Sequence, residues 1–254
     1  IVSESKCIRL NTDSFLSLEN FTTSKKYEPI ETPYGETSEP LTFGSFGNQK
    51  IIFLARHGKN HSIPPHLINY QANIWGLHSA GVKNLIAINT VGSIKTEFMP
   101  GDFVFPNQII DYTYCRKNTF SDGVKKSVNH IDFTYPFDDN LRNQFSKISN
   151  LLKLKNHVNA VYASVQGPRL ESAAEINRYE NDGANIVGMT GMPEASLARE
   201  IGLNYAIICP VANHAAGRGL NKDGITHEEI SVNSEKMSKN IANLIKGIIE
   251  SYGN

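Results

Sequence analysis

Three consecutive residues, Arg56-His57-Gly58, combine a fixed positive charge, a titratable ring and a residue suited to a tight turn. They directly follow an apolar run, residues 51–55, which is typical of a buried strand. Ligands of open α/β sheets bind at the carboxyl ends of strands, and an arginine there can form charge-assisted hydrogen bonds with an anion. The sequence therefore predicts an anion site at Arg56 and His57.

The same three residues have a second interpretation. Histidine phosphatases and phosphoglycerate mutases carry Arg-His-Gly after their first strand, and the histidine accepts the phosphoryl group. In those enzymes the motif lies near the amino terminus and is followed by an acid or glutamine and then a small hydroxyl residue. Here it begins at residue 56 and continues Lys59-Asn60-His61, so this interpretation is disfavoured.

A series of further motifs favours a different assignment. In chain order they are Leu54-Ala55-Arg56-His57-Gly58, His61, Asn69-Tyr70-Gln71-Ala72-Asn73, Pro100-Gly101-Asp102, Gly167-Pro168-Arg169, Met189-Thr190-Gly191-Met192-Pro193-Glu194 and the strand that leads to Asn213. The series resembles the methylthioadenosine phosphorylase branch of the trimeric purine nucleoside phosphorylases. The resemblance implies an α/β fold with a mixed, partly barrel-like sheet flanked by helices. It also implies a single domain over residues 1–254 and a homotrimer.

The resemblance further implies that inorganic phosphate is the co-substrate and that no metal or organic cofactor is needed. Arg56 and His57 match the phosphate-binding pair of the family. Thr90 lies in the turn of residues 89–93, whose backbone N–H groups are expected to hold the same anion, because such amides carry partial positive charge. Thr190 matches a hydroxyl that contacts both phosphate and sugar.

The amino-terminal phosphate loop departs from the family pattern. Relatives have a glycine-rich loop after their first strand, whereas the best alignment here is Leu10-Asn11-Thr12-Asp13-Ser14. Asn and Asp tolerate positive φ best among the non-glycine residues, so the turn can form. Thr12 is therefore a candidate phosphate ligand, beside an aspartate that repels the anion.

The expected base pocket favours a 6-oxopurine over adenine. Adenine-specific relatives end the last motif strand in two aspartates separated by one residue, whereas this chain has Asn213 and Ala215. Relatives specific for 6-oxopurines have asparagine at the first position and an acid after the Gly-Pro motif, which is Glu171 here. A carboxylate accepts the N1–H of a 6-oxopurine and an amide N–H donates to O6, whereas adenine lacks the N1 proton.

Asn213 and Glu171 are thus the expected catalytic residues. Asn213 would stabilise the negative charge of the leaving purine through N7 and O6, and Glu171 would fix the base. Glu171 also has a structural interpretation as a helix first-turn acid. Leu170 stands where relatives have an aromatic residue, which predicts weaker stacking on the base.

Five residues are expected around the sugar. Met189 matches a residue packed against the ribose, and His61 lies in a loop that borders the sugar. His130 resembles a residue that caps the 5′ pocket from a neighbouring subunit. His227 stands about where hydroxyl-preferring relatives place a histidine for the 5′-OH, although it also suits the first turn of a helix. If His227 faces solvent, Val232 and its neighbours would form an apolar wall that prefers a thioether.

The combination of a methylthio-type chain with an inosine-type base pocket predicts phosphorolysis of S-methyl-5′-thioinosine. The products would be the free base and methylthioribose 1-phosphate, and inosine or guanosine remains an alternative substrate. Two further alternatives stay open. One is a methylthioadenosine phosphorylase, and the other is a nucleoside-binding protein with weak catalysis.

These residues require a sheet to position them. Short β-branched runs alternate with amphipathic helical segments, which is typical of a sheet covered by helices. Helices are expected over residues 141–152, from Pro193 to Gly202, and after Thr226, where Glu229 completes a capping box. Residues 20–50 predict a surface hairpin or loop. The expected strands are residues 51–55, 85–89, 103–111, 160–165, 185–189 and 205–211.

Composition excludes several classes of partner. The 25 Lys and Arg residues balance the 25 Asp and Glu residues, so no overall field attracts nucleic acid or anionic lipid. No apolar run approaches the roughly 18 residues needed to span a membrane, and no secretion signal is recognised. The 3 cysteines show no metal-ligand spacing, which favours free thiols in a reducing compartment. We therefore expect a cytoplasmic protein whose partners are a purine nucleoside and phosphate.

Overall fold

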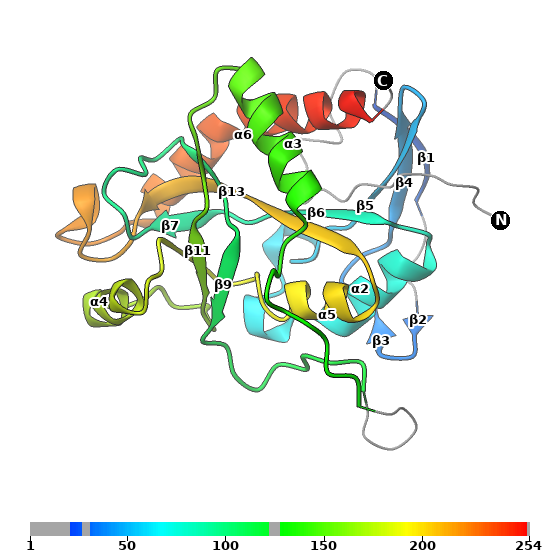
Figure 1. The fold of residues 1–254 in the computed structure, drawn as a ribbon, viewed down its shortest axis with the longest axis horizontal. Helices are drawn as coiled ribbons and strands as arrows, with labels where there is room; N and C mark the ends of the chain where they lie inside the picture. Colours follow the sequence, from blue (N-terminus) through cyan, green and yellow to red (C-terminus); the bar gives the residue numbers. More distant parts are fainter. Residues whose placement is uncertain (1–20, 27–30, 122–127, 253–254) are drawn as a thin grey trace.

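A computed structural model of the chain describes residues 21–26, 31–121 and 128–252 (Figure 1). Its centre is a mixed eight-stranded sheet in the order β10-β8-β13-β7-β12-β11-β9, with β6 paired to β13. The strands are β6 (Asn84–Ile88), β7 (Val91–Ser93), β8 (Phe103–Phe105), β9 (Gln108–Asp111), β10 (Asn156–Val158), β11 (Val161–Ser164), β12 (Ile186–Gly188) and β13 (Asn204–His214).

The sheet curls toward closure, and one short connection shows why. β8 and β9 lie near opposite ends of the strand order, yet only Pro106 and Asn107 separate them in the chain. Two residues span too little distance to cross a flat sheet of this width, because strands lie about 4.8 Å apart. The sheet must therefore bend until its two ends approach each other, which confirms the expected partly barrel-like fold.

Alternate residues of β13 face opposite apolar clusters, as the two-residue period of a strand requires. Tyr205, Ile207 and Cys209 pack in the cluster that includes α2 and α5, whereas Ala206 and Ile208 pack in the cluster that includes α3 and α6. Figure 1 shows these two pairs of helices on opposite sides of the sheet, with α4 near β9 and β11. The helices are α2 (Tyr70–Ser79), α3 (Asp139–Leu151), α4 (Ala173–Asn181), α5 (Glu194–Glu200) and α6 (His227–Ser251).

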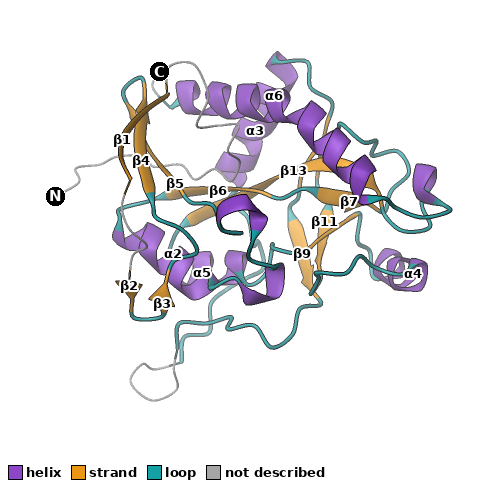
Figure 2. Cartoon of the chain, turned by 180° about the vertical axis from the view of Figure 1, so that it is seen from behind, coloured by secondary structure: helices purple, strands orange, loops and turns teal. Residues whose placement is uncertain are grey.

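A second, antiparallel sheet precedes the central one in the chain. It consists of β1 (Phe21–Lys26), β4 (Thr42–Phe46) and β5 (Gln49–Phe53), and a small hairpin of β2 (Glu31–Thr32) and β3 (Gly35–Glu36) lies between its first two strands in sequence. Figure 2 shows this sheet at one end of the molecule and α4 at the other. The hairpin expected within residues 20–50 is present, but the surface location is wrong for β4, because Thr42 and Phe46 at its two ends are buried.

Most expected elements are present, and one strand is corrected. The expected strand over residues 103–111 is two strands, β8 and β9, which pair with different neighbours. Pro106 lies at the break, where a residue without an N–H cannot continue the ladder. The α3 and α5 helices match the expectation, and Gly202 (φ 75°) follows the end of α5 as its stop. Helices α2 and α4 were not predicted.

Candidate active site

Three of the predicted site segments meet beside the middle of β13. The first half of β13 pairs with β6 and its second half pairs with β7. β7 runs antiparallel to β12, with Gly92 opposite Val187, so the carboxyl end of β12 returns toward the turn between β6 and β7. This register brings the turn that contains Thr190 toward Thr90. Asn213 lies on the neighbouring strand, opposite Gly92.

The turn after β5 buries Arg56 and leaves His57 half-buried. The backbone N–H of Gly58 donates to the carbonyl of Ala55 at 3.0 Å, which closes the turn. Gly58 has φ 72°, and a Cβ at this position would lie 2.9 Å from the Ser62 hydroxyl. Only glycine adopts this geometry without strain. The turn therefore requires glycine as the third residue of the Arg-His-Gly motif.

Arg56 is buried in the core. Its side chain donates to Glu194 at 2.8 Å, to the carbonyl of Ile88 at 2.6 Å and to Asn89 Oδ1 at 2.5 Å. Arg56 and Glu194 are each 1% exposed. Burial opposes the charge of Arg56, but Glu194, Tyr205 and Tyr70 together outweigh that effect and the arginine pKa is raised. The positive charge predicted to attract phosphate is thus already balanced by a buried acid.

Tyr162 connects the Arg56 cluster with the turn of Thr190. Asn89 Nδ2 donates to the Tyr162 hydroxyl at 3.5 Å, and the backbone of Thr190 hydrogen-bonds to the same hydroxyl. Burial raises the pKa of Tyr162, so this hydroxyl stays protonated. Asn89 precedes Thr90 in the chain, so one buried network fixes the segments that carry Arg56, Thr90 and Thr190.

His57 is half-buried and uncharged. Its Nδ1 lies 2.9 Å from the carbonyl of Ile63, which can only accept, so Nδ1 carries the proton and Nε2 is the acceptor nitrogen. Burial, followed by the charge of Arg56, lowers the pKa of His57 to about 3. The His57 ring stacks on the ring of His61, with centroids 4.0 Å apart. His61 is more exposed than His57, and partial burial followed by the charge of Arg56 also lowers its pKa.

Asn213 lies where β13 bulges against β7. The register shifts between Val211 and Asn213, which takes Ala212 out of the pairing with β7. The carbonyl of Ala212 instead accepts from Asn233 of α6 at 2.7 Å. Asn213 itself is 6% exposed, and its Nδ2 donates to the carbonyl of His214 at 2.7 Å. The bulge therefore sets the direction of Asn213 and binds α6 to the same point of the strand.

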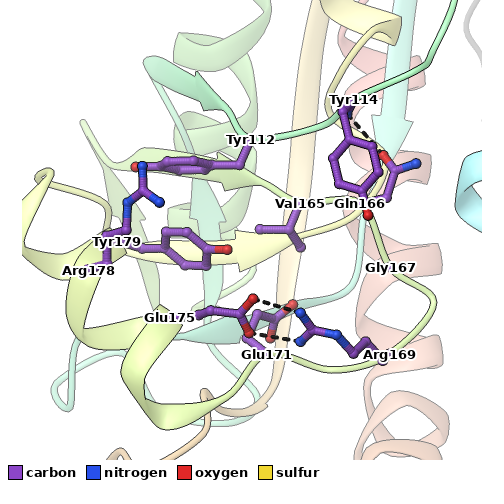
Figure 3. A pocket seen from close by; sticks show the side chains of 10 residues that line it. All are labelled: Tyr112, Tyr114, Val165, Gln166, Gly167, Arg169, Glu171, Glu175, Arg178 and Tyr179. Atoms are coloured by element: carbon purple, nitrogen blue, oxygen red, sulfur yellow. Dashed lines mark hydrogen bonds and ion pairs between the residues drawn. The ribbon is translucent and has the colours of Figure 1, made fainter.

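A cavity of about 350 Å³ opens beside the loop that carries Glu171 (Figure 3). The loop after β9, the loop after β11 and α4 form its walls, and Glu171 is half-buried there. Burial raises the pKa of Glu171 above its usual range. Asn213, Met189 and Thr190 do not line this cavity. The structure thus places Glu171 at a cavity, but does not bring it to Asn213 within that cavity.

Glu175, and not Glu171, is the first-turn acid of α4. Ser172 is the N-cap, and the side chains of Ser172 and Glu175 form a reciprocal capping box. Glu175 also holds both terminal nitrogens of Arg169, at 2.7 and 2.8 Å, which together with the cap lowers its pKa to about 2. The structural interpretation of Glu171 is therefore wrong, since it lies outside the helix, ahead of the cap.

The remaining candidates are spread over loops. Leu170 and Met189 are half-buried. A Cβ on Gly167 would collide with the Met189 side chain, so the loop that carries Gly167 and Leu170 lies directly against Met189. His130 is exposed on the segment between β9 and α3. Thr12 lies outside the described residues. The same is true of the side chains of His227 and Val232, although both residues belong to α6.

The chain is similar to known proteins over most of its length. Residues 14–250 match the phosphorylase superfamily. The chain belongs to this family. The 6-oxopurine nucleoside phosphorylase of Pyrococcus furiosus is 45% identical over 231 residues, which cover 89% of this chain and 86% of the relative. A probable S-methyl-5′-thioinosine phosphorylase of Xanthomonas campestris is 43% identical, with 85% of this chain and 86% of the relative covered.

Solved structures of the superfamily share the fold. Methylthioadenosine phosphorylase from Schistosoma mansoni in complex with adenine superposes with a TM-score of 0.91 at 28% identity, over 98% of this chain and 92% of that one. A methylthioadenosine phosphorylase from an antarctic soil metagenomic library gives a TM-score of 0.90 at 28% identity, over 98% and 86%. The predicted family and fold are thus confirmed.

Four residues that organise the site were not predicted from the sequence. Glu194, Asn89 and Tyr162 form the buried network around Arg56, and Arg116 joins two of the site loops through backbone carbonyls. Among the described residues, no three His, Cys, Asp or Glu side chains gather as they would around a metal ion. In the same part of the chain, no helix has the length and apolar character to cross a membrane.

Proposed function

We propose that the chain catalyses phosphorolysis of 6-oxopurine nucleosides and prefers S-methyl-5′-thioinosine. The two relatives above carry names of these activities and are more similar in sequence than the structural neighbours named for methylthioadenosine. The observation that carries the proposal is the position of Asn213. Asn213 lies on β13 opposite Gly92 of β7, and Thr90 is in the turn that immediately precedes β7. The base amide therefore lies on the strand beside the turn of one phosphate candidate.

In the proposed reaction an oxygen of phosphate attacks C1′ of the ribose while the C1′–N9 bond breaks. The electron pair of that bond goes to the purine. Asn213 uses one N–H on His214, which leaves a second N–H suited to O6; its Oδ1 would accept from N7 once the departing purine anion takes up a proton there from water. Donors preorganised toward developing charge usually contribute more to the rate of such reactions than any other single effect. Glu171, once ionised, would accept from N1–H.

Phosphate would be held by Arg56, His57, Thr90 and Thr190. Because Glu194 balances the charge of Arg56, the arginine contributes orientation more than net charge. The neutral His57 offers Nε2 as an acceptor, which suits the remaining P–OH of hydrogen phosphate. The Thr90 backbone and the Thr190 hydroxyl would supply donors to the other oxygens.

A panel of four nucleosides with and without phosphate tests the proposal. Release of free base from methylthioinosine and inosine, only when phosphate is present, is the expected result. Equal cleavage of methylthioadenosine would identify a methylthioadenosine phosphorylase and contradict the proposed roles of Asn213 and Glu171 in base choice. Nucleoside binding without release of base would identify a binding protein instead.

We also propose that the enzyme acts as a homotrimer in which His130 reaches a neighbouring subunit. His130 is exposed in the single chain, and it lies on the long segment between β9 and α3. Sedimentation equilibrium should give three times the mass of the chain. A monomer that retains full activity would contradict the proposal.

A further inference from the structure

Arg116 lies where three loops of the central sheet converge. β11 pairs in parallel with both β9 and β12, so the carboxyl ends of these three strands lie along one edge. The chain leaves β9 at Asp111 and reaches Arg116 five positions later. Arg116 belongs to none of the family motifs, so its sequence context predicts no role for it.

One guanidinium there engages two loops. Its terminal nitrogens donate to the carbonyls of Met189 at 2.8 Å and Met192 at 2.6 Å, on the turn after β12. They also donate to the carbonyls of Val165 at 3.2 Å and Gln166 at 2.8 Å, on the loop after β11. The Nε donates to Gln166 Oε1 at 3.2 Å. A further bond joins the guanidinium to the Tyr70 hydroxyl at 3.2 Å.

These acceptors flank the candidate ligand-binding residues on both loops. Met189 and Met192 enclose Thr190, the candidate for phosphate and ribose. Val165 and Gln166 begin the loop that leads to Glu171, the candidate for the base. The five N–H groups of a guanidinium are therefore directed at protein acceptors, which is the pattern of a structural clamp and not of a phosphate ligand.

We propose that Arg116 is a positioning residue that fixes the base-binding loop against the ribose- and phosphate-binding turn. This inference rests on the proposed roles of Glu171 and Thr190. With the two loops held at a constant separation, C1′ of a nucleoside bound at both ends stays in line with the phosphate. A displacement of about 1 Å in such an arrangement can cost on the order of 10²-fold in rate.

Lysine cannot replace Arg116 in this role. Its ammonium group has three donors that radiate from a single atom, whereas the guanidinium spreads its donors over a planar fork. Arg116→Lys would therefore keep the charge and lose the simultaneous contact with both loops. Each loop would retain its own ligand contacts.

The test compares Arg116→Lys with Arg199→Lys. Arg199 is an exposed arginine of α5 that also donates to a loop carbonyl, that of Asp132 at 3.2 Å, so the control removes a similar contact elsewhere. For Arg116→Lys we expect kcat to fall on the order of 10²-fold. The affinities for hypoxanthine alone and for phosphate alone should change less than about threefold, and Arg199→Lys should match the wild type.

A second readout needs no catalysis. Calorimetric titration of hypoxanthine with and without saturating phosphate gives the coupling between the two subsites, which for such sites is typically about 5- to 150-fold. We expect Arg116→Lys to reduce this coupling toward one. If the wild type releases no base, the proposed function fails, and the coupling still decides the role of Arg116.

Two outcomes would overturn the inference. One is unchanged kcat and unchanged coupling in Arg116→Lys. The other is a parallel loss of kcat, of both single-ligand affinities and of melting temperature, which would make Arg116 a residue of general stability. Should Arg116→Lys fail to fold, Gln166→Met removes the side-chain acceptor of Nε, together with the bond that the same oxygen accepts from the backbone N–H of Tyr114 at 3.2 Å, and leaves the four carbonyl contacts in place. That variant should lower kcat severalfold with both single-ligand affinities retained, and wild-type kcat in it would count against the clamp.

Discussion

The proposed phosphate-binding end and the proposed base-binding end of the site are built differently. At the phosphate end, Arg56 and Glu194 are each 1% exposed and belong to a buried network that runs through Asn89. At the base end, Leu170 and Glu171 are half-buried on a loop ahead of α4. The first end is part of the core, whereas the position of the second depends on contacts between loops, such as those of Arg116.

This difference suggests that phosphate binding and the choice of base depend on different parts of the structure. Core positions respond to any change in volume or charge, whereas loops tolerate substitution. A phosphate subsite in the core can therefore stay the same in relatives that act on nucleosides with different bases and 5′ groups. The following predictions test this division, beginning with the core.

Arg56→Met should have the largest effect on stability. Loss of the arginine leaves Glu194 buried without its cationic partner, and breaking a buried ion pair in this way costs about 3–5 kcal/mol in free energy of unfolding. The double variant Arg56→Met with Glu194→Gln should recover most of that stability, because the amide is neutral. Both variants should bind phosphate weakly, as measured by the phosphate KM and by direct titration.

The double variant separates folding from function at this position. If it recovers both stability and phosphate affinity, Arg56 serves the fold alone and the predicted phosphate role is wrong. Arg178→Met is the control, since it breaks a surface pair in which Arg178 Nε and Asp182 Oδ2 are 3.8 Å apart. Its unfolding free energy should stay within about 1 kcal/mol of the wild type.

Asn213→Asp should have the largest effect on specificity. A carboxylate repels O6 of inosine and accepts from the amine of adenosine, so the preference should move toward 6-aminopurines. Loss of one preorganised donor costs about 10²–10³ in rate, and we expect that loss in kcat for methylthioinosine. Asn177→Asp places the same charge on an exposed position of α4 and should leave the preference for 6-oxopurine over 6-aminopurine nucleosides unchanged. An unaltered preference in Asn213→Asp would remove the residue from base recognition.

His57 should make the free energy of unfolding fall at acid pH, by less than the loss expected for Arg56→Met. Its pKa is about 3 in the folded chain against 6.5 ordinarily, so between these values only the unfolded chain binds the proton. Stability contributed by the neutral ring is thus fully present above pH 6.5 and is lost as the pH falls toward 3. At pH 5 the loss amounts to at most about 2 kcal/mol, since the ring is partly exposed.

His57→Asn should reduce this dependence, because its amide can still donate to the carbonyl of Ile63 but does not titrate. Urea unfolding at pH 7 and pH 5 would measure the difference between the variant and the wild type. His66→Asn, at an exposed histidine, is the matched control and should keep the pH dependence of the wild type. Identical pH dependence in His57→Asn and wild type would show that the folded chain does not hold the ring neutral.

The sequence predicted the elements whose pattern is local. Residues 205–211 are a β-branched run buried on both faces, and β13 was found there with an extension to His214. Helix α2 was missed because it is buried nearly all round, so no polar face reveals its period. Even Gln71 and Asn73 are buried, with partners at Thr119 and Ser38.

The contacts that organise the site depend on residues far apart in the chain. Arg56 was identified from its motif, but its partner Glu194 is 138 positions away. Arg116 binds backbone carbonyls, which carry no side-chain signature and come together only in the fold. Glu194 could have been noticed as an acid within the sixth motif, whereas nothing in the sequence marks Arg116.

The smallest expected effect concerns the 5′ end of the sugar. Asn233 of α6 donates to the carbonyl of Ala212, next to Asn213, so the helix that carries His227 and Val232 contacts β13 at this point. If Val232 forms an apolar wall there, the methylthio group of methylthioinosine is buried and the hydroxyl of inosine is not paired. Burial of one such group changes specificity by on the order of tenfold, so the preference should be graded.

The ratio of kcat/KM for methylthioinosine to that for inosine measures this preference, and two variants distinguish its sources. Val232→Ser should lower the ratio by weakening the methylthio substrate, whereas His227→Ala should leave it unchanged if His227 faces solvent. If instead inosine is the better substrate of the wild type and His227→Ala loses inosine selectively, the histidine donates to the 5′-OH. The methylthio assignment is then wrong, whereas the proposed base and phosphate roles are unaffected, because they rest on other residues than those of α6.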